Sequence, residues 1–433
     1  MPLNARLFIW FRVFFNARFY YPVLAVFFVD LGLTLDQYAL LNVAWAASIV
    51  ALELPLGAVA DRFGRRPLIV GAAAIMVIEM AVMAFAPAGD PDLLFWVFFV
   101  NRLLSGLAEA AASGADEALA YDTLKNEGCA DKWPVVLSRL QRRMSVGFMI
   151  AMVVGAAVYD PTLVNRVFGT DFDATTTLRF PVYLTLGLSL GALGIALRMT
   201  EPAPAEPKPP MTLRDSVRET LGAGKWILAT PFALAVVVYG CLIDSPGRIV
   251  MTLVSTIYRW YGIPEAFYGV LGATLGLLGL ISPTIATWLM RKLSPWGIYV
   301  VIVVLALGSL FGLAQGSAAV GIASMGLLGI GFNLLGFFTS HYLNLVAPSE
   351  SRATILSFRS LAGNLSYGVF GWLYAVFFVW KAGGERPAPN SQLETDTLAG
   401  TLQWIPIVFL VLLVPVFIAS RRVGRMCECE VRT

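Results

Sequence analysis

The chain has 433 residues, of which 58% are hydrophobic and only 14% are charged, with a formal net charge of +3. A soluble protein of this length needs a more polar surface, and the basic residues are dispersed in short loops rather than gathered into a face for nucleic acid. The four cysteines form no disulfide pattern, and Cys427 and Cys429 have no further ligands nearby, so neither a metal site nor any cofactor is expected.

Apolar runs of about 20 residues, the length of helix that crosses a bilayer, recur along the chain. Backbone groups in lipid must be satisfied internally, and continuous rather than alternating apolar runs favour helices over a barrel. We therefore predict an all-α membrane protein. The twelve expected spans are Leu7–Leu31, Gln37–Ala60, Leu68–Ala86, Leu93–Tyr121, Leu140–Tyr159, Phe180–Met199, Lys225–Ile249, Phe267–Met290, Trp296–Gln315, Ala319–Val346, Thr354–Trp380 and Leu402–Ser420.

Lysine and arginine concentrate in alternate loops. They follow the even-numbered spans, whereas Pro87–Asp92 and Gly316–Ala318 contain none. Short cytoplasmic loops carry an excess of these residues, so both termini are expected in the cytoplasm. The location expected is the plasma membrane, which in a bacterium is the cell inner membrane.

One segment, TEPAPAEPKPP at Thr200–Pro210, is rich in proline. Prolines at this density prevent a helix and favour an extended connector. The expected organisation is therefore an N-terminal six-helix bundle at 1–199, a cytoplasmic linker at 200–224, and a C-terminal six-helix bundle with a cytoplasmic tail at 225–433. Two such bundles around a central cavity are a known transporter plan, in which the halves rock to give alternating access.

The loop between spans two and three reads GAVADRFGRRP, Gly57–Pro67. A basic loop at this place helps to set the orientation of the chain in the membrane. Its spacing also resembles the signature of the major facilitator superfamily, which lies in the same loop. The residues that carry the resemblance are Gly57, Asp61, Arg62, Gly64, Arg65 and Arg66. The matching loop of the second half has Thr287 where the aspartate would align.

The resemblance implies a conformational latch that closes the cytoplasmic side when the cavity faces outward. Gly57 would let the second helix approach a neighbour closely, and Gly64 would permit a tight turn. Asp61 can accept hydrogen bonds from amides at a neighbouring helix N-terminus. The arginines can meet carboxylates at the end of span four, where Asp122 is the expected partner and Glu117 the alternative.

Span four carries many charges for a membrane helix. Arg102, Glu109, Ser113 and Asp116 are seven, four and three residues apart, which on a helix returns them to one face. They either satisfy one another inside the bundle or face a wet cavity or ion path, because ionisable groups in lipid are costly.

The segment Arg102-Leu-Leu-Ser-Gly106 resembles the second motif of the drug/proton antiporter branch. That resemblance implies a role for the intramembrane arginine in proton transfer. The Gly-Pro pair typical of that branch is missing from span five, where Gly147 and Gly155 remain. The candidates for proton coupling are Glu109, Asp116, Arg102 and Glu53.

Arg18 lies near the middle of span one, and Pro22 a turn later can bend the helix. An arginine there favours an anionic or zwitterionic substrate, because a cation would be repelled in a low-dielectric cavity. Glu79 lies in span three, which the resemblance places at the lipid-facing periphery, and it is left out of the site. The substrate-cavity candidates are Asn16, Arg18, Ser113, Asp244, Asn333 and His341.

Two of these positions have open alternatives. Arg248 either snorkels outward, pairs with Asp244 or contacts the substrate. His341, the only histidine, either moves protons or is a polar filler held by Ser340 and Asn344.

No phosphate loop, metal cluster or nucleophile–base arrangement appears in the sequence, so neither an ATP-driven pump nor an enzyme is expected. We predict a monomeric secondary active transporter in the lipid bilayer, exchanging protons for a small-molecule substrate. Proton-coupled export of an amphipathic or anionic compound is the leading interpretation. Proton-coupled import of an organic anion is the alternative, and a transport-inactive sensor or scaffold is the alternative of another class.

Overall fold

The computed structural model describes the chain except residues 88, 203–212, 349–350 and 431–433, and except the side chains of residues 58, 61, 62, 213, 353 and 419–430. The described residues form helices and no strand. Twelve segments are long and apolar enough to cross a membrane, one at each predicted position. The all-α fold with twelve spans is therefore confirmed.

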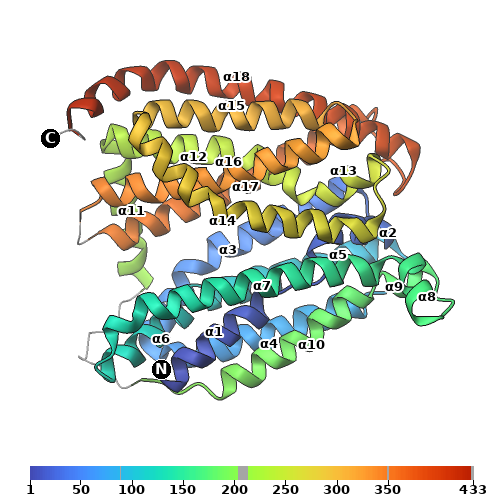
Figure 1. Cartoon of the computed structure of the whole chain (residues 1–433), viewed down its shortest axis with the longest axis horizontal. Helices are drawn as coiled ribbons and strands as arrows, with labels where there is room; N and C mark the ends of the chain where they lie inside the picture. The colour runs from blue at the N-terminus through green and yellow to red at the C-terminus, as the bar shows by residue number, and fades with distance from the viewer. Residues whose placement is uncertain (88, 203–212, 349–350, 431–433) are drawn as a thin grey trace. The chain divides into compact units, whose positions relative to one another are not determined.

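The chain forms two compact units, and each of them takes in a short piece from the other side of the linker. Unit 1 comprises Met1–Leu33, Ala44–Val217 and Pro264–Ala273. Figure 1 shows α1, α4, α7 and α10 side by side, with α8 and α9 beyond the end of α7. The helices of unit 1 are α1 (Leu3–Asn16), η1 (Tyr21–Val23), α2 (Leu24–Asp30), α4 (Arg65–Ala84), α5 (Pro91–Ala112), α6 (Ala115–Asn126), η2 (Ala130–Lys132), α7 (Trp133–Tyr159), α8 (Pro161–Phe168), α9 (Ala174–Thr177), α10 (Phe180–Leu197) and η3 (Glu265–Phe267).

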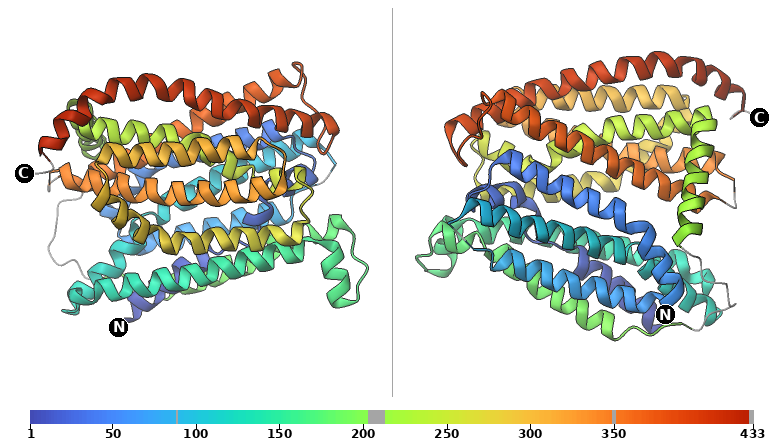
Figure 2. Two further views of the ribbon diagram at one scale, coloured as in Figure 1. Left: turned by 45° about the horizontal axis from the view of Figure 1, so that its top comes forward. Right: turned by 180° about the vertical axis from the view of Figure 1, so that it is seen from behind.

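Unit 2 comprises Thr34–Val43, Arg218–Ile263 and Thr274–Thr433. Its helix α12 packs against α16, α17 and α18, and α15 packs against α16 and α18. Figure 2 shows α15 to α18, coloured from amber through orange to red, from two further sides. The helices of unit 2 are α12 (Pro231–Thr252), α13 (Val254–Trp260), α15 (Pro295–Leu313), α16 (Ala318–Val346), α17 (Arg352–Lys381) and α18 (Gln392–Glu430). Three helices contribute to both units: α3 (Leu35–Phe63), α11 (Leu213–Ala229) and α14 (Tyr268–Lys292).

The predicted linker contains the start of α11, a helix that the sequence did not predict. Span seven begins at Pro231 rather than at Lys225, because a proline fits the first turn of a helix but not its interior. The division of the chain at 200–224 stays a prediction.

Two spans are broken. Span one leaves the helical conformation at Ala17 and resumes as η1 at Tyr21, next to Pro22, so the predicted bend is confirmed. Span four stops at Ala112 and restarts at Ala115, because Gly114 adopts the left-handed conformation with φ of +75°. The prediction of one unbroken helix in span four is wrong at this point.

Candidate functional site

The bend of span one is fixed by its neighbours in unit 1. The backbone N–H of Phe19 donates to Thr185 Oγ1 of α10 at 3.1 Å. A Cβ atom at Gly155 of α7 would lie 1.7 Å from the carbonyl oxygen of Phe19, so only glycine lets α7 approach this closely. The residue just before Phe19, Arg18, is thereby held inside the unit.

Arg18 pairs with Glu79 of α4. The side chain of Arg18 is 4% exposed, and its Nη1 atom is 3.1 Å from Glu79 Oε1. The same nitrogen donates to the hydroxyl of Tyr20 at 2.8 Å. Glu79 is fully buried. The sequence-based site did not include it and therefore lacked the partner of Arg18. In this conformation the charge of Arg18 is balanced by a side chain of its own unit.

Arg102 of α5 is buried without such a partner. It is 6% exposed, and its guanidinium lies 4.9 Å from the centre of the Phe28 ring. Neither Nε nor Nη2 has a hydrogen-bond partner among the described residues. Gly106, in the same motif, allows α5 to pack on α3, because its Cβ would lie 2.6 Å from Ser48 Cβ. The motif therefore combines a close helix contact with an unsatisfied buried cation.

The break at Gly114 divides the predicted stripe of span four. Glu109 is half-buried on α5, Ser113 is exposed at the break, and Asp116 is fully buried on α6. An Asp116 oxygen is 2.5 Å from Arg12 Nε of α1, and Asp116 Oδ1 accepts from the N–H of Glu117. The predicted stripe therefore does not lie on one continuous helix, because the left-handed glycine separates Asp116 from Arg102 and Glu109. Asp116 stabilises the start of α6, where a carboxylate is favourable.

The loop between spans two and three meets α6 as expected. Arg65 forms an ion pair with Asp122 of α6. Gly64 has φ of +92°, a backbone conformation that favours glycine. A Cβ at Gly57, however, would meet nothing within 4 Å among the described residues, so the expected close approach is not seen there. The side chains of Asp61 and Arg62 lie outside the described part of the structure.

Glu201 and Arg66 form a reciprocal cap between the start of α4 and the end of α10. The carboxylate of Glu201 accepts hydrogen bonds from the N–H groups of Arg65 (3.0 Å) and Arg66 (2.6 Å) at the start of α4. The side chain of Arg66 donates from Nε to the carbonyl oxygen of Met199 at 2.6 Å and from Nη2 to that of Leu197 at 3.2 Å, at the end of α10. Each charge therefore meets the helix end of opposite partial charge.

Unit 2 carries a charge pair of a different kind on α12. Arg248 Nη2 is 2.5 Å from Asp244 Oδ2, one helical turn away. Arg248 also donates to Asn364 Oδ1 at 3.1 Å and lies 5.0 Å from the ring centre of Tyr367, both on α17. Of the alternatives for Arg248, the structure shows pairing with Asp244.

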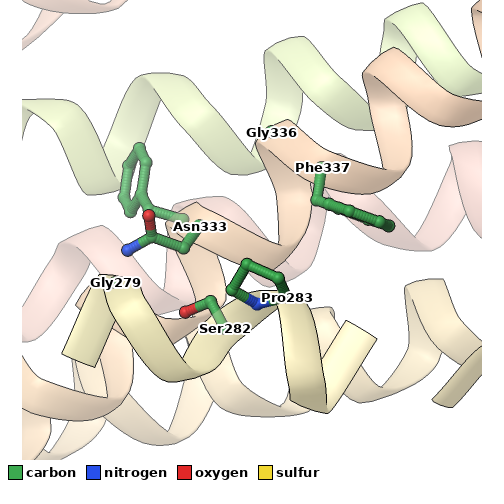
Figure 3. Close-up of a pocket in the computed structure, with 7 residues that line it drawn as sticks. Gly279, Ser282, Pro283, Asn333, Gly336 and Phe337 are labelled. Atoms are coloured by element: carbon green, nitrogen blue, oxygen red, sulfur yellow. The ribbon is translucent and has the colours of Figure 1, made fainter. Parts of the chain in front are cut away.

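A cavity of about 450 Å³ lies between α14 and α16 in unit 2. Figure 3 shows Ser282 and Pro283 on one helix opposite Asn333 and Phe337 on the other. The amide Nδ2 of Asn333 donates to the carbonyl oxygen of Gly329 at 2.8 Å. The lining carries no charged side chain and consists of Gly279, Ser282, Pro283, Phe332, Asn333, Gly336 and Phe337.

The remaining candidates have ordinary surroundings. His341 is exposed and stacks on the ring of Phe337, with ring centres 6.3 Å apart. Asn16 donates to the carbonyl oxygen of Arg12 within its own helix, and Glu53 is half-buried on α3. Among the described residues, no three His, Cys, Asp or Glu side chains come together as a metal site needs.

Sequence reasoning missed Glu79, Glu201 and the cavity. Glu79 did carry a signal, because a carboxylate inside a span usually pairs with another intramembrane charge, and Arg18 was available. Glu201 lies in a proline-rich stretch, where the sequence carries no signal for a helix cap. The cavity depends on how α14 and α16 turn toward each other, which their uniformly apolar sequences do not indicate.

The family model for the Major Facilitator Superfamily matches residues 7–382. Over 102 residues the chain is 31% identical to the tetracycline resistance protein, class G, of Vibrio anguillarum, covering 24% of this chain and 22% of that protein. Over 134 residues it is 30% identical to a D-xylose transporter of Levilactobacillus brevis, covering 30% of this chain and 26% of that one. The chain thus matches only about a quarter of the length of these relatives.

Among solved structures, the fold is similar to that of the nucleoside transporter NupG in its D323A mutant. The TM-score is 0.73 at 16% identity, with 95% of this chain and 99% of that chain covered. The match of the family model across most of the sequence, together with twelve candidate spans, shows that the chain belongs to the major facilitator superfamily of membrane transporters.

Proposed function

We propose that the protein is a proton-coupled exporter of a small amphipathic or anionic organic compound, with both termini in the cytoplasm. The observation that carries proton coupling is the set of ionisable groups buried inside unit 1, namely Arg18, Glu79, Arg102 and Asp116. Buried ionisable groups in membrane spans are costly and usually serve ion or substrate movement. The similarity of one segment to a tetracycline resistance protein supports export.

The cavity of unit 2 is the proposed site for the apolar part of the solute. Its aromatic and glycine lining suits a flat apolar group, and the Asn333 amide offers one polar contact. The cavity wall also reaches α12, because a Cβ at Gly247 would lie 2.5 Å from the Phe332 ring. The next residue is Arg248, whose half-buried guanidinium is placed to meet an anionic group of the same solute.

The contact between Arg65 and Asp122 is the proposed cytoplasmic latch. Both side chains are partly exposed, so the pair can open and close without leaving a charge buried in lipid. Alternating access would make and break this contact once in each cycle.

Proton-coupled import is the second candidate. It is favoured by the similarity of one segment to a D-xylose transporter. An importer and an exporter differ in the direction of the proton gradient that drives solute movement, so one assay distinguishes them. A sensor or scaffold would move neither protons nor solute.

Proteoliposomes carrying a pH dye test these candidates with tetracycline, D-xylose and 1-naphthoate as probes. Export predicts that tetracycline or 1-naphthoate moves protons in the opposite direction to itself. Proton movement in the same direction as D-xylose or 1-naphthoate would establish import. Probes that raise the Tm of the purified protein but move no protons would mean a sensor.

The cavity is tested in the same vesicles by Gly336→Leu, which places a side chain where a Cβ meets nothing within 4 Å. This variant should lose probe binding. Gly308→Leu, at an exposed glycine of α15 with equal space, is the matched control and should keep it. Equal binding by both variants would place the solute elsewhere.

A further inference from the structure

Unit 1 holds two buried arginines, Arg18 and Arg102, and a fully buried carboxylate, Glu79, in spans one, four and three. Glu79 pairs with Arg18, while Arg102 keeps two guanidinium nitrogens without a hydrogen-bond partner among the described residues. A guanidinium stays protonated in proteins, so Arg102 cannot shed its charge to suit its surroundings. A buried charge without a hydrogen-bonding partner is costly, and the ring of Phe28 compensates for only part of that cost.

The three charged groups share one small region. Asn101 Nδ2 donates to the backbone carbonyl oxygen of Glu79 at 2.7 Å, and Arg102 is the next residue along α5. Arg18 in turn contacts both the carboxylate of Glu79 and the hydroxyl group of Tyr20. Glu79 is therefore paired with Arg18, and its backbone is bonded to the residue next to Arg102.

The supports of the two arginines differ. Arg102 stands inside a regular helix, and the bond from Asn101 keeps α5 attached to α4 at the level of Glu79. Arg18 stands in the non-helical segment between α1 and η1, so its position depends on the neighbours that hold the bend. A change of that segment would separate Arg18 from Glu79 and leave Arg102 close to it.

We propose that Glu79 is a coupling residue that exchanges between these two partners. Its carboxylate pairs with Arg18 in the conformation described here and with Arg102 in a second conformation of unit 1. The exchange keeps the buried carboxylate paired in both states and transfers the unpaired cation from span four to span one. Assigning the two states to a transport cycle rests on the proposed function, whereas the exchange itself can be measured without any solute.

Nuclear magnetic resonance of protein labelled with ¹⁵N-arginine in nanodiscs tests the exchange. The Nε–H signal of Arg102 is identified by its loss in Arg102→Lys. Arg18→Gln removes the present partner of Glu79, so the carboxylate should turn to Arg102 and shift its Nε–H proton signal downfield. In Arg18→Gln/Glu79→Gln the signal should return to its original position.

Two control variants complete the design. Arg18→Lys keeps a cation beside Glu79, and Arg12→Gln removes an arginine that pairs with a different carboxylate, Asp116. Both should leave the Arg102 signal unmoved. If Arg18→Gln does not fold, Thr185→Val replaces it. Losing the hydroxyl that accepts from the Phe19 N–H loosens the segment that holds Arg18 against Glu79, so the signal should shift part of the way.

The proposal is overturned if the Arg102 signal of Arg18→Gln, or of Thr185→Val where that variant is used, is the same as in the parent. Glu79 would then be a fixed structural partner of Arg18. Failure of the proposed function would leave this result untouched, because no transported solute enters the measurement.

Discussion

The ion pairs Arg18–Glu79 of unit 1 and Asp244–Arg248 of unit 2 both balance a charge within a membrane span, but they differ in exposure and in the helices that they join. The first joins two spans, and its side chains are 4% and 1% exposed. The second lies within one helix, with Arg248 31% and Asp244 20% exposed. A pair closed to its surroundings can change partner only when its helices move, whereas a partly open pair can meet a solute directly. This difference in exposure agrees with the roles proposed above, coupling for the first pair and solute recognition for the second.

The largest expected effect on stability is at the fully buried pair, Arg18–Glu79. Glu79→Gln leaves Arg18 buried without a counter-ion, which should lower the free energy of unfolding by about 3–5 kcal/mol. Asp244→Asn breaks the partly exposed pair and should cost less, about 1–3 kcal/mol, because Arg248 keeps its hydrogen bond to Asn364. Unfolding of both variants in mixed micelles measures the difference, and equal losses would remove the contrast between the pairs.

An intermediate effect is expected at the bend that holds Arg18. Gly155→Ala forces a methyl group against the carbonyl oxygen of Phe19 and should cost roughly 1–3 kcal/mol through overpacking. Gly187→Ala on α10 meets open space and should cost nothing. The same unfolding assay compares them. A Gly155→Ala variant as stable as Gly187→Ala would show that the backbone at the bend can shift at little cost in free energy.

The smallest effect on stability is expected at the proposed latch. Asp122→Asn removes a partly exposed partner of Arg65 and should change the free energy of unfolding by less than about 1 kcal/mol. Proton-driven movement of whichever probe is transported should nevertheless fall, at an unchanged amount of protein in the membrane. Glu117→Gln alters the exposed neighbour and is the control. Transport unaffected by Asp122→Asn would reduce this contact to a surface ion pair.

The positions of the spans, the bend at Pro22 and the partner of Arg65 could all be predicted from the sequence. Each follows from a local cause: apolar length, a proline, or a basic loop beside the charged end of a helix. The break at Gly114 could not, because the surrounding alanines favour helix and one glycine does not reveal its conformation.

The pairing of Arg18 with Glu79 was missed for a different reason. Periodicity predicts that a span is a helix, but it does not say which face turns toward which neighbour. Glu79 is 61 positions from Arg18 along the chain, and only the packing of α4 beside the bend brings them together. The cavity between α14 and α16 was missed for the same reason, because it too depends on which faces of two helices meet.

The reciprocal cap at Glu201 has a consequence for dividing the chain. Beyond the last residue of α10, Thr200 donates its N–H to Asn4 Oδ1 at 3.1 Å, and Glu201 supplies both acceptors for the first amides of α4. A fragment ending at residue 199 would retain all six spans of the N-terminal half but leave two amides without their acceptor. A fragment ending just after Glu201 keeps every one of these bonds. The bonding of this six-span segment is therefore completed by a carboxylate outside its last membrane helix rather than at the end of that helix.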